Sequence, residues 1–168
     1  EATFWEVFDA ICRQCGAQRA SWGGSRNVYL WPAPAKRVAS CCSGLFRITA
    51  TQVLFSRTSS LTEAGGTFRR LKVQVDVAIE PGHPLMVGQD KVAEAKDARG
   101  RSLVEDDSNR WRSGEWKSDN EVTLWLEPPK KRAKRIASLK GTIRFKVRVG
   151  PGFREVEAPF AFRDLPLP

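Results

Sequence analysis

Hydrophobic and polar residues alternate along the last third of the chain, from residue 137 to residue 162. Between Ile143 and Val149, apolar residues at odd positions alternate with basic residues at even positions. After Gly150-Pro151-Gly152, apolar residues return at every second position from Val156 to Phe162. A period of two indicates strands with one buried face. We therefore predict a β-hairpin that forms the centre of the domain.

The charges on the outward face of this hairpin predict its register. Inward residues are odd-numbered on the first strand and even-numbered on the second, so paired positions should sum to an odd number. We expect Arg148 to face Glu155 and Lys146 to face Glu157, because opposite charges across a strand pair are stabilising. This pairing leaves a loop of four residues, 150–153.

Strand patterns also occur earlier in the chain, at residues 45–55, 71–79, 92–96, 102–104 and 122–126. The first of them changes parity near Thr51-Gln52, which predicts a β-bulge. Residues 56–66 are polar and are expected to form a loop. In total the pattern predicts about seven or eight strands. Strands and helices do not alternate after Pro34, as they would in an α/β fold. We predict an antiparallel β-sandwich over residues 36–168.

A helix is expected before the sandwich, from about Phe4 to Cys15. Thr3 and Glu6 have the spacing of a capping box, and Gly16 stands where a left-handed residue ends a helix. Asp9 and Arg13 are four residues apart, the spacing of an ion pair. A short strand over residues 27–31 is expected to follow. Residues 1–35 thus form a helix-plus-strand element, a candidate for the end of a small α/β domain.

Two resemblances bear on this organisation. The helix spacing from Phe4 to Gly16 resembles the end of the short N-terminal α/β domain of secretins and TonB-dependent receptors. An amphipathic helix packed on the sandwich is the alternative. Three strings resemble uncharacterised extracytoplasmic bacterial proteins: Ala98-Arg99-Gly100-Arg101-Ser102-Leu103, Ile136-Ala137-Ser138-Leu139-Lys140-Gly141-Thr142-Ile143 and the Phe160-x-Phe162-x-Asp164-Leu165 ending. This resemblance implies a secreted or periplasmic bacterial β-sandwich without a known activity.

The net charge of +9 is largely one local cluster over a mild background. Its members are Lys130, Lys131, Arg132, Lys134 and Arg135. Such a run suits nucleic acid, an anionic glycan or anionic lipid. The alternative is a solvated loop between strands.

Tryptophans provide the second candidate site. Trp111 and Trp116 are interleaved with Arg and Lys, a pattern that suits stacking or an interface hot spot. The alternative is that both rings cover the open end of the sandwich. Trp125 is expected on the outward face of the strand at 122–126 and is a further candidate for interface contacts.

The four cysteines leave two interpretations open. Cys12 and Cys15 lie in the last turns of the expected helix, where the helix dipole disfavours a redox-active thiolate. Adjacent Cys41 and Cys42 supply a zinc knuckle poorly, because neighbouring residues of a strand point to opposite faces. What remains is a disulfide, with Cys15 and Cys41 as the favoured pair, or buried free thiols.

The sequence offers little support for catalysis. His83 is the only histidine, and no glycine-rich phosphate loop links a strand to a helix. No run approaches the roughly 20 apolar residues of a transmembrane helix. We expect a non-catalytic extracytoplasmic binding or assembly module, without cofactor or metal, that contacts other protein chains or its own copies. Polyanion binding through residues 130–135 is the alternative.

Overall fold

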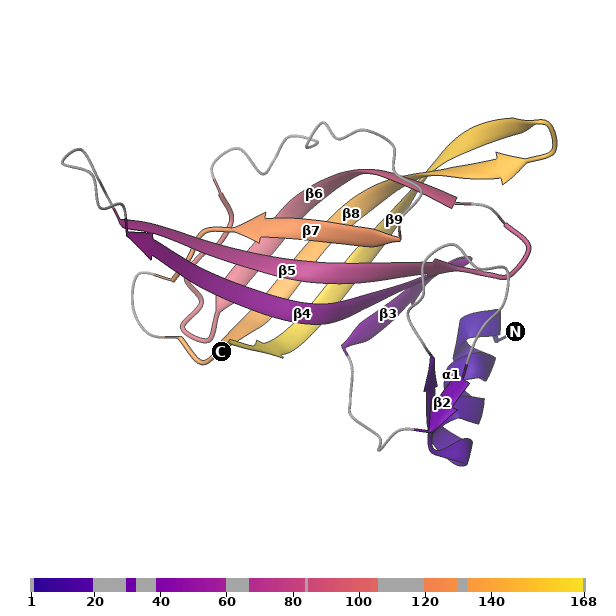
Figure 1. The fold of residues 1–168 in the computed structure, drawn as a ribbon, viewed down its shortest axis with the longest axis horizontal. Coiled ribbons are helices and arrows are strands. Elements are labelled where there is room, and N and C mark those ends of the chain that lie inside the picture. The colour runs from indigo at the N-terminus through magenta and orange to yellow at the C-terminus, as the bar shows by residue number, and fades with distance from the viewer. Residues whose placement is uncertain are drawn as a thin grey trace.

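The structure is a computed structural model that describes residues 2–19, 30–32, 39–59, 67–83, 85–105, 120–129 and 133–167. It is mostly β, with one helix at the N-terminus, and confirms the predicted β-sandwich (Figure 1). The elements in chain order are α1 (Phe4–Cys15), β1 (Ala17–Arg19), β2 (Leu30–Pro32), β3 (Ser40–Ser43), β4 (Phe46–Ser59), β5 (Thr67–Ile79), β6 (Leu85–Asp97), β7 (Glu121–Leu126), β8 (Arg135–Val149) and β9 (Gly152–Pro166).

Seven of the strands form the two antiparallel sheets of the sandwich. The first sheet has the order β3-β4-β5-β7, and the second has the order β6-β8-β9. Figure 1 shows the second sheet crossing behind the first. Strands β1 and β2 pair with each other outside these sheets.

The alternating apolar residues of both sheets meet in one core. On β5, Leu71, Val73, Val75 and Val77 are all fully buried. The rings of Phe46 and Phe145 join the two sheets with a centroid distance of 4.6 Å. Burying each large apolar side chain contributes about 1.5–3 kcal/mol, so this core is the main source of stability.

The predicted hairpin is present as β8 and β9, but its predicted register is wrong by two residues. Lys146 lies opposite Glu155 rather than Glu157, and Arg148 lies opposite Phe153 rather than Glu155. The turn between Val149 and Gly152 therefore contains two residues in place of the expected four.

The geometry of Gly150 accounts for this tighter turn. Gly150 has a φ of 59°, and two-residue hairpin turns require positive φ at their first position. The outward charges still pair. Arg144 Nη2 lies 2.9 Å from Glu157 Oε1, and Lys146 Nζ lies 3.8 Å from Glu155 Oε1.

Strands β4 and β5 differ from the prediction in length. The expected bulge is confirmed by a register shift between Ala50 and Gln52. The expected loop at residues 56–66 is wrong for residues 56–59, which continue β4, and its remainder lies outside the described residues. Strand β5 begins at Thr67, before the predicted start at residue 71. Both strands run beyond the sandwich as a two-stranded ribbon, which we call the β4–β5 arm and define as residues 55–59 and 67–70 (Figure 1).

Helix α1 begins and ends as predicted. The Thr3 hydroxyl accepts from the Glu6 amide, and the Glu6 carboxylate accepts from the Thr3 amide at 2.8 Å. Gly16 has a φ of 62° and ends the helix. The part of the chain with described coordinates contains no helix of the length and hydrophobicity needed to cross a membrane.

The helix is attached to the first sheet by a buried ring and an ion pair. Trp5 is 1% exposed, and its indole Nε1 donates to the Leu45 carbonyl at 2.8 Å. The predicted Asp9–Arg13 ion pair is wrong. Asp9 Oδ1 instead pairs with Arg47 Nη2 of β4 at 3.0 Å, while the Arg13 side chain donates to the Asp9 carbonyl. Arg47, which is distant in the sequence, thus replaces Arg13 as the partner of the Asp9 carboxylate.

Candidate functional site

The predicted basic cluster is only partly described. Lys130, Lys131 and Arg132 lie outside the described residues. Lys134 is exposed, and Arg135 forms an exposed ion pair with Asp164 at 3.0 Å. The Arg135 charge is therefore already matched.

Trp125 lies on the outward face of β7, as predicted. It is half-buried, and its cross-strand partner on β5 is Lys72. Lys72 Nζ lies 5.8 Å and Arg70 Cζ lies 5.7 Å from the centroid of the indole ring, within the range of cation–π attraction. The predicted site residues Trp111 and Trp116 lie outside the described residues.

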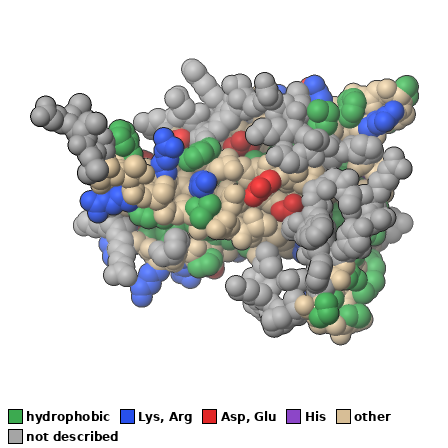
Figure 2. All heavy atoms as spheres, in the orientation of Figure 1, with side chains coloured by type: hydrophobic (Ala, Val, Ile, Leu, Met, Phe, Trp, Pro, Cys, Tyr) green, Lys and Arg blue, Asp and Glu red, His purple; other side chains and the backbone are tan. Residues whose placement is uncertain are grey.

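The β4–β5 arm, which the hydrophobic pattern did not predict, continues this aromatic and basic surface. All of its residues from Phe55 to Ser59 and from Thr67 to Arg70 are exposed. Phe68 is 62% exposed and Phe55 is 42% exposed. Figure 2 shows blue Lys and Arg side chains at the end of the molecule from which the arm projects, and others at the opposite upper end.

A second exposed apolar surface lies on α1. Phe4, Val7 and Ile11 share one side of the helix, while Trp5 and Cys12 are buried on another. Figure 2 shows green side chains over the region that α1 occupies in Figure 1. We call Phe4, Val7 and Ile11 the α1 stripe.

The cysteines are free thiols, so the predicted disulfide between Cys15 and Cys41 is not formed in this structure. Cys15 is exposed at the end of α1, whereas Cys41 is half-buried on β3. Desolvation raises the pKa of the Cys12, Cys41 and Cys42 thiols. They are therefore protonated at neutral pH and are poor nucleophiles.

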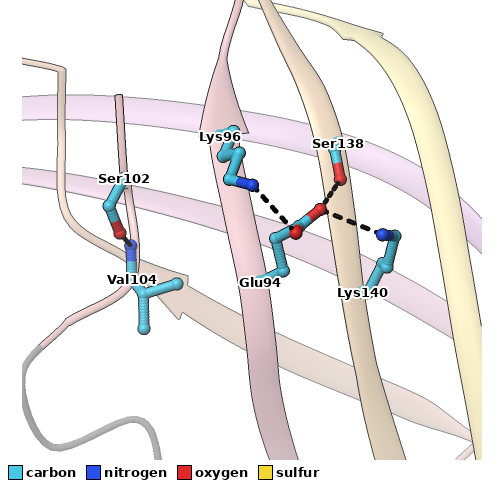
Figure 3. A network of polar contacts seen from close by, with 6 residues as sticks. All are labelled: Glu94, Lys96, Ser102, Val104, Ser138 and Lys140. Atoms are coloured by element: carbon cyan, nitrogen blue, oxygen red, sulfur yellow. Dashed lines mark hydrogen bonds and ion pairs between the residues drawn. The ribbon is translucent and has the colours of Figure 1, made fainter. Parts of the chain in front are cut away.

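A polar network joins β6 to β8 on the outward face of the second sheet (Figure 3). The Ser138 hydroxyl donates to Glu94, and Lys96 Nζ and Lys140 Nζ lie 3.0 Å and 3.1 Å from its carboxylate oxygens. These donors, Ser138 first, lower the pKa of Glu94 to about 2. A serine near lysines can serve as a nucleophile, but this hydroxyl is engaged as a donor to a charged carboxylate. The network links two strands.

Replacing Glu94 should give a pH-dependent loss of stability. The pKa of Glu94 lies below the ordinary glutamate value of about 4.3, so its contribution is complete above that value and disappears as the pH falls toward about 2. We expect Glu94→Gln to lower Tm by about 2–4 °C at pH 7. Thermal melts across this pH range should show the wild-type and variant curves converge.

Glu155→Gln, which removes a longer ion pair to Lys146, is the control with a smaller effect. A Glu94→Gln difference that stays constant down to pH 2 would contradict the assignment.

Metal ligation finds no support in the described part of the chain, where no group of three or more His, Cys, Asp and Glu side chains could hold an ion. The candidate surfaces are therefore the α1 stripe and the β4–β5 arm with Trp125. Scans against known protein families, curated proteins and solved structures find no match to this chain.

Proposed function

We propose that this chain is a non-catalytic binding module that associates with a second copy of itself through the α1 stripe. The observation that carries the proposal is the exposure of Phe4, Val7 and Ile11, at 38%, 49% and 47%. Their spacing of three and four residues aligns them along one side of the helix, as in helices that pair with another helix.

Charge supports a second copy as the partner. A net charge of +9 makes two copies repel each other over most of their surface. The α1 stripe contains no charged residue. Protein interfaces are depleted of charge and enriched in aromatic residues at their centre. The stripe is thus where like-charged copies can approach.

The edges of the two sheets offer further contacts. Strands β3, β7, β6 and β9 lie at these edges, and a strand edge can pair with another chain. Trp125, one of the three tryptophans that the sequence pattern predicts at an interface, lies on the edge strand β7. The extracytoplasmic location is proposed from the family resemblance alone.

The double variant Val7→Gln, Ile11→Gln should weaken self-association. We expect the dissociation constant to rise about tenfold or more, because each loss of about 1.4 kcal/mol of apolar burial is a factor of ten. Sedimentation velocity over micromolar to millimolar concentrations measures the effect, with circular dichroism to confirm that the helix is retained.

The matched control is Arg13→Gln, an exposed position outside the stripe on the same helix. It should not weaken association and can strengthen it slightly by removing a positive charge. The proposal fails if the wild-type chain remains monomeric at millimolar concentration. It also fails if the double variant and the control associate equally.

A further inference from the structure

The β4–β5 arm contains an unfavourable charge arrangement. Arg57 lies directly opposite Arg69 in the strand register, and like charges at such positions are destabilising. Neither guanidinium forms an ion pair with any carboxylate among the described residues, and the same holds for Arg70 and Lys72. A repulsive pair on an exposed ribbon is relieved when an anion lies between the two guanidinium groups.

Several basic side chains elsewhere have an acidic partner. Arg47, Arg101, Arg135 and Arg144 each pair with an Asp or Glu side chain. Exposed cations without an acidic partner among the described residues also occur elsewhere, at Arg148 and Arg154 for example. Among the strand pairs that the structure describes, however, only Arg57 and Arg69 place two cations directly opposite each other. An anionic partner is the occupant that this charge distribution favours.

Aromatic rings accompany the cations on both faces of the arm. Successive outward positions along β5 are Phe68, Arg70 and Lys72, because side chains of a strand alternate between its faces. Trp125 of β7 lies beside Lys72 on this outward face. On the opposite face of the ribbon, Phe55 accompanies Arg57 and Arg69. Each face therefore combines charge with a flat apolar ring.

We propose that the arm and Trp125 bind single-stranded nucleic acid. On the outward face, phosphates would lie along Arg70 and Lys72, and unpaired bases would stack on Phe68 and Trp125. Where the strand continues around the edge of the ribbon, Arg57 and Arg69 on the opposite face would bind a further phosphate. A positively charged track with exposed aromatic rings is the chemistry that recognises a single strand. A duplex keeps its bases stacked on each other and would use only the cations. This site is separate from the α1 stripe and does not depend on self-association.

Fluorescence anisotropy with a labelled oligothymidylate of about 20 nucleotides tests the proposal. With three or four phosphates contacted, log Kd should depend on log salt with a slope of about 2–3. The double variant Arg57→Gln, Arg69→Gln should weaken binding and lower that slope by about 1.4. Arg148→Gln, Arg154→Gln removes the same charge from the turn end of the β8–β9 hairpin, at exposed positions, and is the matched control.

A second variant separates stacking from charge. Phe68→Ser should weaken oligothymidylate binding about 5- to 100-fold with the salt slope unchanged. Phe153→Ser, at a comparably exposed phenylalanine of the β8–β9 hairpin, should have no effect. All six side chains are exposed, so thermal melts should show the variants folded.

Several outcomes would overturn the proposal. If the double variant of Arg57 and Arg69 and the control double variant of Arg148 and Arg154 weaken binding equally, the affinity comes from the net charge of the protein and not from the arm. If heparin binds as tightly as oligothymidylate, and Phe68→Ser changes neither affinity, the arm binds negative charge without contacting the bases. Binding to vesicles of phosphatidylglycerol but not to oligothymidylate would assign the arm to a lipid surface instead.

Discussion

Gly141→Ala should cost about 3 kcal/mol or more of the free energy of unfolding. Gly141 is buried in the middle of β8, between Val92 of β6 and Phe160 of β9. A Cβ atom at this position would lie 2.3 Å from the Lys91 carbonyl oxygen and 2.5 Å from Cζ of Phe160. The ring of Phe160 occupies the space that a side chain would need. Denaturant unfolding measures the loss, with a Tm lowered by roughly 10 °C.

Gly152→Ala is the matched control for this substitution. Gly152 begins β9 and does not adopt positive φ, and a Cβ atom added there would meet no atom of the described chain within 4 Å. Alanine there should change stability by less than about 0.5 kcal/mol. In a Gly141→Ala background, Phe160→Leu should restore only part of the loss, because the clash with the Lys91 carbonyl involves the backbone. Equal effects of the two glycine substitutions would show that β8 can shift to accept a side chain.

Features determined by neighbouring residues were predictable from the sequence. The capping box of Thr3 and Glu6, the left-handed Gly16 and the bulge after Ala50 all depend on short stretches of chain. Each is found where the pattern places it. The Asp9–Arg13 ion pair is the exception, because Arg47 of β4 competes for the same carboxylate. Local spacing does not reveal a tertiary competitor.

The hairpin register could not be settled by the pattern of hydrophobic residues. A slip of two residues leaves every side chain on the same face, so the alternation is equally satisfied in both registers. The charges did not distinguish the two registers either, since Lys146 lies opposite a glutamate in both of them. The conformation of Gly150 decides between them, and it favours the shorter turn.

The β4–β5 arm could not be predicted from alternation because it has no buried face. Residues 56–59 are polar, and without a core on one side the period-two signal that identifies strands is lost. The remaining signal was the combination of Phe68 with Arg69 and Arg70 next to a clear strand. The candidate nucleic-acid site follows from the register, which aligns Arg57 with Arg69.

Trp5→Ala should release α1 from the sandwich. The indole ring is 1% exposed and packs edge-on against Phe4 and Phe8, with centroid distances of 5.0 Å and 5.7 Å. Removing a buried aromatic side chain costs about 3–5 kcal/mol. A helix of 12 residues is too short to persist without packing. The helical signal in circular dichroism should therefore disappear.

Hydrogen exchange distinguishes local release of α1 from general destabilisation. The core residues that surround Phe145 do not include Trp5, so amides of β5 and β8 should keep their protection in Trp5→Ala while those of α1 lose theirs. Val7→Ala, at a half-exposed position of the same helix, should leave both sets protected. Equal loss of protection in α1, β5 and β8 would show instead that the helix and the sandwich unfold as one cooperative unit. The same experiment tests the expected boundary near residue 35, because a separate N-terminal element must be able to open while the sandwich remains closed.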